Sequence, residues 1–143
     1  MTQCCKKPAP QRASIRCSAC GGALQAVEAR TLLHLLRAPF NQALVEQGYY
    51  FCANADCDRV YQGEDGCGYS REQLRLEVGQ KSRDPKRMLC YCFDINLERV
   101  MAERAQCGES ASRAFVVEQT GQGRCACEIR NPSGRCCLKE FPR

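Results

Sequence analysis

The chain has 143 residues, which allows one ordinary domain or two small ones and excludes a large enzyme core. Its 14 cysteines make up about a tenth of the chain, a content typical of disulfide scaffolds and metalloproteins. The formal charge of +5 comes without a basic stripe interleaved with aromatic residues, so we expect no nucleic-acid binding.

The N-terminal segment bears on the compartment. Residues 1–14, MTQCCKKPAPQRAS, lack the apolar stretch of a signal peptide, and no later run approaches the roughly 20 apolar residues that cross a bilayer. We therefore expect a cytoplasmic protein without membrane insertion, in which thiols stay reduced or bind metal. Because His34 is the only histidine, a metal site must be built almost wholly from thiolates.

Composition divides the chain into three parts. Residues 1–14 are polar and without period, which predicts a mobile arm whose Cys4 and Cys5 are surface thiols. Residues 15–80 and 81–143 then form two domains. The charged stretch GQKSRDPKR, residues 79–87, has no apolar period and is interpreted as the linker between them.

Two short cysteine pairs in the first domain predict a zinc site. Cys17 and Cys20 lie in CSACGG, and Cys52 and Cys57 lie in CANADC. Two such pairs at this separation are typical of a closed tetrahedral site, although four unrelated buried thiols are the alternative. His34, among leucines, is interpreted as a packed or half-exposed ring rather than a ligand, and Cys67 has no partner at ligand spacing.

Short elements are expected around these pairs. Residues 23–29 and 48–53 have strand patterns, and alternating Leu74, Leu76 and Val78 predict a half-buried strand over 71–80. Residues 41–47 have a helical pattern that Gly48 ends, and 32–36 read as a short helix broken at Pro39.

The second domain opens with Cys90-x-Cys92. A disulfide across one residue is strained, so two thiolates converging on one ion or cluster are the better interpretation. Asn96 is a candidate N-cap for a helix that ends at Gly108, and a second helix begins near Ser110 or Ser112. Two helices joined by a short turn return the chain to its start. Cys90 and Cys92 are thereby expected to approach the later cysteines, which are Cys127, Cys136 and Cys137.

The order Cys-x-Cys, helix, turn, helix, TGQG, Cys and NPSGRCC resembles the [2Fe-2S] domain related to bacterioferritin-associated ferredoxin. With the preceding zinc unit, the whole resembles the N-terminal half of CopZ-type copper chaperones. The resemblance implies an α+β fold. In it, a small zinc-binding α/β unit with four cysteine ligands is followed by a helix-turn-helix [2Fe-2S] domain. It implies zinc ligation by Cys17, Cys20, Cys52 and Cys57, and cluster ligation by Cys90, Cys92, Cys127 and one of Cys136 or Cys137, of which Cys137 is chosen.

The resemblance also frames the function. No Met-x-Cys-x2-Cys loop occurs in the chain, so the copper-carrying heavy-metal-associated domain of that family is expected to be missing or separate. The first hypothesis is a redox component of copper handling. Its cluster accepts an electron from a reductase and reduces Cu(II) to Cu(I) for a copper carrier or a copper-exporting ATPase, with Cu(I) a further candidate ion. The second is a ferredoxin-like electron-transfer adaptor, and a zinc-ribbon interaction module is the third.

No ordinary active site is visible in the sequence. It has no histidine base, no nucleotide loop after a strand and no Ser-His-Asp set, which argues against a classical enzyme. Four thiolates around zinc and four around an oxidised cluster would each carry about −2, which leaves roughly +1 of the formal charge. Ser133 and Gly134 are expected to begin the last helix and to direct their amides at cluster sulfurs.

Overall fold

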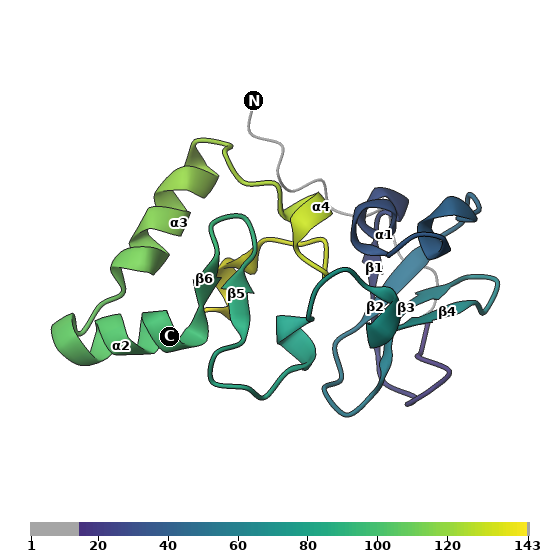
Figure 1. Ribbon diagram of the computed structural model, residues 1–143, viewed down its shortest axis with the longest axis horizontal. Helices are drawn as coiled ribbons and strands as arrows, with labels where there is room; N and C mark the ends of the chain where they lie inside the picture. Colours follow the sequence, from purple (N-terminus) through teal and green to yellow (C-terminus); the bar gives the residue numbers. More distant parts are fainter. Residues whose placement is uncertain (1–14, 143) are drawn as a thin grey trace.

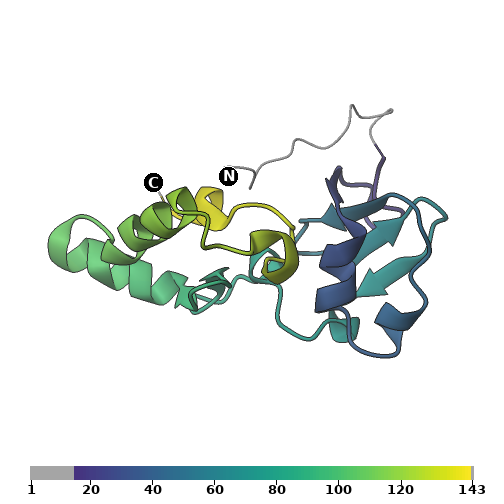
Figure 2. The ribbon, with the colours of Figure 1, turned by 90° about the horizontal axis from the view of Figure 1, so that it is seen from above.

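The computed structural model describes residues 15–142, and two hydrophobic cores lie side by side along the molecule (Figures 1 and 2). The first core gathers residues between Leu32 and Val78, and the second gathers residues between Leu89 and Phe141. Cys4 and Cys5, predicted to be surface thiols, lie outside the described residues.

The first core is built on an antiparallel four-stranded sheet. The strands are β1 (Leu24–Val27), β2 (Tyr49–Cys52), β3 (Arg59–Gly63) and β4 (Gly68–Ser70), in that spatial order. Helix α1 (Ala29–Leu35) lies against the sheet (Figure 2) and contributes Leu32 to the core. Along β2 the alternation buries Tyr49 and Phe51 and leaves Tyr50 half-buried, as a sheet with one covered face requires. The strands predicted over 23–29 and 48–53 are therefore confirmed.

Two other predicted elements are wrong. The helix predicted over 41–47 is reduced to the 3-10 turn η1 (Phe40–Gln42), and Val45 is exposed. The strand predicted over 71–80 is replaced by the 3-10 turns η2 (Arg71–Gln73) and η3 (Gly79–Lys81). Between those turns a single bridge joins Leu74 to Leu36. The alternating pattern thus reports the burial of Leu74 and Val78 but not a sheet position.

The second core combines a hairpin with two helices. Strands β5 (Met88–Cys90) and β6 (Ile95–Asn96) pair antiparallel, and helices α2 (Leu97–Cys107) and α3 (Ala111–Gly121) follow. The Asn96 side chain accepts from the Arg99 amide at 2.9 Å, and Gly108 ends α2 at φ 75°, which favours glycine. Ser110 caps α3 by accepting from the Arg113 amide at 3.1 Å. The two predicted helices and their caps are confirmed.

The C-terminal segment completes the second core and reaches the first core through α4. Helix α4 (Cys127–Arg130) lies against α1 (Figure 1). The 3-10 turn η4 (Cys137–Glu140) contacts β5 and α3. The α+β class expected from the sequence is confirmed by this arrangement of antiparallel sheet and helices. None of the helices in residues 15–142 combines the length and hydrophobicity of a membrane span.

Candidate metal centres

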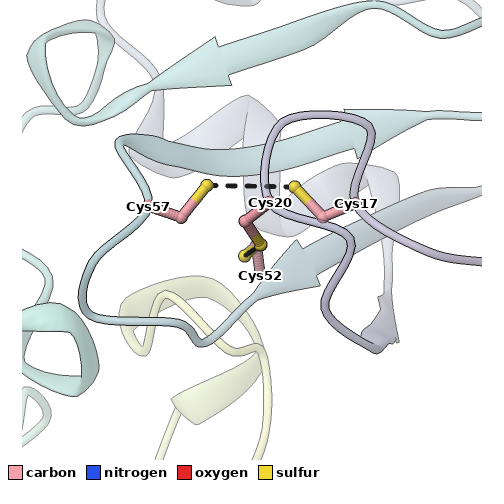
Figure 3. Close-up of side chains that lie close together, drawn as sticks. All are labelled: Cys17, Cys20, Cys52 and Cys57. Carbon is pink, nitrogen blue, oxygen red and sulfur yellow. Dashed lines mark hydrogen bonds between the residues drawn. The ribbon is translucent and has the colours of Figure 1, made fainter.

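Four cysteine sulfurs converge at one end of the four-stranded sheet. The Sγ atoms of Cys17, Cys20, Cys52 and Cys57 all lie within 4.8 Å of one another (Figure 3). The Cys17–Cys57 and Cys20–Cys52 sulfur distances are 3.9 Å and 3.7 Å. Zinc–sulfur bonds of about 2.3 Å in a tetrahedron place the sulfurs about 3.8 Å apart. The spacing of these four sulfurs therefore fits one Zn²⁺. Below, the four residues are called the four-cysteine set.

Each pair of this set sits in a tight turn. In the first turn, the Cys17 amide donates to the Gly22 carbonyl at 2.9 Å, and Gly21 adopts φ 75°. Cys52 ends β2, and the Cys57 amide closes the second turn by donating to the Asn54 carbonyl at 3.1 Å. The sheet register holds both turns at the same end, because Leu24 of β1 pairs with Cys52.

Backbone amides point at the sulfurs. The Gly22 amide lies 3.4 Å from the Cys20 Sγ and, as the main cause, lowers the pKa of Cys20 to about 6. Burial raises the pKa of Cys52 to about 12 and also raises that of Cys57. A cation that binds all four sulfurs must displace the remaining protons, so binding is expected to strengthen as the pH rises.

Cations also approach the carbonyls of both turns. Lys81 Nζ donates to the Cys52 and Asn54 carbonyls, Arg71 donates to the Ala55 and Cys57 carbonyls, and Arg16 donates to the Gly21 carbonyl. Lys81 is buried, whereas the two arginines are exposed. The linker interpretation of residues 79–87 missed this lysine, because a charged stretch gives no signal that one ammonium folds inward.

The two residues set aside as non-ligands lie away from this site. His34 is exposed on α1. The half-buried Cys67 has its Sγ 3.8 Å from Gln47 Nε2 and 3.9 Å from the Tyr69 hydroxyl, and burial raises its pKa. Neither residue joins the four-cysteine set.

A second group of cysteines lines the other core. Cys90 ends β5, Cys92 follows in the hairpin turn, Cys127 begins α4 and Cys137 begins η4. The Cys92 and Cys127 sulfurs are 3.8 Å apart, and Cys90, Cys127 and Cys137 are buried. The helical hairpin thus returns the chain to the Cys90 turn.

The thiols of this group interact with one another. Hydrogen bonding with the Cys137 thiol is the main cause that lowers the pKa of Cys90 to about 7 and that of Cys127 to about 3. The same contacts, with burial, raise the pKa of Cys137 well above its usual range. Cys137 therefore contacts two other members of the group, whereas Cys136 is half-buried at the N-cap of η4.

The amides that reach these sulfurs differ from the expected ones. Ser133 and Gly134 precede η4 in a turn, and their amides donate to the Asn131 side chain at 3.1 Å and the Asn131 carbonyl at 2.8 Å. The Ala126 amide instead donates to the Cys92 Sγ at 3.2 Å. Further amides reach Cys90 from Cys92 and Phe93, and Cys127 from Cys137. These donors suit sulfurs that carry negative charge.

The second group is more open than the first. Within residues 15–142, the four-cysteine set is the one group whose sulfurs all lie within 4.8 Å of one another. The second group therefore does not match the compact tetrahedron of a single ion, but its four thiols and their amide donors fit the chemistry of an iron–sulfur cluster. Cys125 is half-buried beside this core and interacts with Cys127, and Cys107 is exposed at the end of α2.

Comparisons with known proteins agree with the first centre. Residues 14–75 match the zf_CopZ family, described as a zinc-binding domain. The "Copper chaperone CopZ" of Archaeoglobus fulgidus is 34% identical over 94 residues, which are 65% of this chain and 44% of that protein. The X-ray structure of the A. fulgidus CopZ N-terminal domain superposes with a TM-score of 0.71 at 27% identity, covering 90% of this chain and 100% of that one.

The fold and the four-cysteine set define a protein with a zinc-binding domain followed by a second, cysteine-lined core. Residues 14–75 match the CopZ-type zinc-binding domain, and the chain is similar in sequence and fold to the N-terminal domain of CopZ, as the motif resemblance predicted. It spans less than half the length of the CopZ relative.

Proposed function

We propose that residues 15–80 are a zinc-binding unit in which Cys17, Cys20, Cys52 and Cys57 hold one Zn²⁺. The sulfur spacing and the match to a zinc-binding domain support this assignment. Zinc is inert to electrons, and a closed set of four thiolates leaves no position for a substrate. Its role here is to stabilise a sheet whose core is small.

Residues 81–143 are proposed to hold a [2Fe-2S] cluster through Cys90, Cys92, Cys127 and Cys137. The observation that carries this proposal is the convergence of four mostly buried thiols that accept hydrogen bonds from backbone amides. Their sulfurs are more widely spaced than those of the four-cysteine set. Such a cluster supplies one electron at a time. The chain would contribute the thiolates, the amide donors that tune the potential and the apolar walls that limit solvent access.

The biological role proposed is copper handling. The relative's name, "Copper chaperone CopZ", supports it. The cluster proposed for the second core would supply the redox group that zinc cannot. Electrons from a reductase would convert Cu(II) to Cu(I), one electron for each copper ion. The Cu(I) would then pass to a copper carrier or a copper-exporting ATPase in the cytoplasm.

Metal analysis of protein purified without oxygen tests both centres. We expect about one zinc and two irons per chain. Cys17→Ser and Cys57→Ser should lose zinc, Cys90→Ser and Cys92→Ser should lose iron and retain zinc, and the control Cys67→Ser should retain both. Zinc without iron after anaerobic reconstitution would remove the redox role and leave a zinc-binding module.

A further inference from the structure

A buried lysine lies directly against the zinc-binding turn. The side chain of Lys81, in η3, is 2% exposed, and its Nζ donates to the Cys52 carbonyl at 2.9 Å and to the Asn54 carbonyl at 2.7 Å. None of the ion pairs found in residues 15–142 involves Lys81. Within residues 15–142, this ammonium thus has two carbonyl partners and no carboxylate partner.

Such a charge requires compensation. Burying an ammonium is costly unless it is hydrogen-bonded and close to opposite charge, and two carbonyl dipoles satisfy only part of that need. Four thiolates around Zn²⁺ carry a net charge of about −2. Cys52, a member of the four-cysteine set, supplies one of the carbonyls to Lys81. The four-cysteine set is therefore the negative group best placed to balance this ammonium.

The position of Lys81 also links the two cores. Its neighbour Gln80 donates through Nε2 to the Asn131 side chain at 2.6 Å. Asn131 is buried and in turn accepts from the Ser133 amide and hydroxyl, which shapes the loop between Cys127 and Cys137. Adjacent residues of η3 thus contact the zinc turn on one side and the second cysteine loop on the other.

We propose that Lys81 is a positioning residue that balances the charge of the zinc–thiolate centre and fastens the segment leading to Cys90 onto the Cys52 turn. The proposal rests on the proposed zinc site. Because binding linkage is reciprocal, a seated Lys81 increases zinc affinity to the same extent that zinc favours the seated lysine.

Two substitutions separate charge from packing. Lys81→Met removes the charge and keeps much of the side-chain length, whereas Lys81→Gln keeps N–H donors for the carbonyls without the charge. Lys86→Met removes an exposed lysine of the same segment and serves as the matched control. Zinc affinity of the full chain is measured by competition with a chromophoric chelator, and unfolding midpoints are measured with zinc and with excess chelator.

Both Lys81 variants are expected to bind zinc roughly 10-fold or more weakly, the range for partners outside the ligand shell, while Lys86→Met matches wild type. Their unfolding midpoints should fall more in zinc than in chelator. Equal falls in both conditions with unchanged zinc affinity would make Lys81 merely structural, and wild-type affinity in Lys81→Gln would exclude charge matching. A wild-type chain that binds no zinc would overturn the proposed zinc site itself, which the competition assay detects independently of the variants.

Discussion

The hydroxyl of Tyr61 in β3 donates a 2.5 Å hydrogen bond to the carbonyl of Pro132, which lies between Cys127 and Cys137. Tyr61 is fully buried, and Pro132 is buried as well. Beside this contact, the Thr31 hydroxyl donates to the Glu128 carbonyl at 2.5 Å. The sheet and the second cysteine loop are therefore joined by buried polar contacts as well as by the packing of α1 on α4.

Tyr61→Phe should weaken this junction. The substitution keeps the ring in the first core but leaves the buried Pro132 carbonyl without its donor. An unsatisfied buried group costs about 1–3 kcal/mol, so we expect the free energy of unfolding to fall by that amount. Chemical denaturation of the zinc-loaded chain measures it.

The matched control for Tyr61→Phe is Tyr50→Phe, on the half-buried face of the neighbouring strand β2. It removes the same hydroxyl away from the junction and should change the free energy of unfolding much less. Equal losses in the two variants would mean that the Tyr61 contact does not hold the cores together.

The predictable parts of this fold depend on local chemistry. The helix ends are marked by Asn96, Gly108 and Ser110, through hydrogen bonds and backbone angles that involve residues close in sequence. The helical hairpin can therefore be predicted without tertiary information. The short Cys17 and Cys52 turns are likewise local devices. Cysteine spacing predicts the convergence of the first set because zinc sites repeat one geometry.

The missed parts depend on distant partners. Leu74 has the alternation of a strand, but in the described residues it forms an isolated bridge, to Leu36, and no strand. Lys81 is charged and lies in a polar stretch, yet its ammonium is buried because the Cys52 and Asn54 carbonyls face it from 27 to 29 residues away in sequence. Asn131 similarly organises its loop through Gln80. No local pattern signals such partners.

Glu103 of α2 should make stability depend on pH. Its carboxylate accepts from the Ser112 amide at 2.8 Å, the Ser112 hydroxyl at 2.5 Å and the Ser110 hydroxyl at 3.3 Å. Burial alone would raise the pKa of Glu103, but these hydrogen bonds outweigh it and lower the pKa below its usual value. A lowered carboxyl pKa stabilises the fold above the unfolded value, about 4.3, and this contribution is lost as the pH falls through the folded pKa.

We therefore expect Glu103→Gln to lower the free energy of unfolding by about 1 kcal/mol at pH 7, with a smaller difference from wild type at progressively acidic pH. Denaturant titrations across that range measure the difference. Glu109→Gln, an exposed carboxylate between the same helices, is the control and should show little change. A difference for Glu103→Gln that does not vary with pH would place its effect in packing rather than charge.

The final cluster ligand can be assigned by paired substitutions. Cys137 is 1% exposed and its thiol contacts those of Cys90 and Cys127, whereas Cys136 is half-buried. Cys137→Ala is expected to lose the visible absorbance and iron of the anaerobically purified chain, and Cys136→Ala to retain them. The reverse pattern would assign Cys136 as the ligand, and neither variant should change the zinc content.

The copper role is tested by adding Cu(II) to chemically reduced protein without oxygen. Because a [2Fe-2S] cluster releases one electron, we expect about one Cu(I) per chain, formed as the reduced-cluster EPR signal disappears. Thiols also reduce copper, so the experiment uses a chain in which Cys4, Cys5 and the exposed Cys107 are changed to Ser. A further Cys90→Ser change, which should remove the cluster, is expected to abolish the reaction. Copper reduction while the cluster stays reduced would contradict the copper role and favour an electron-transfer adaptor for another acceptor.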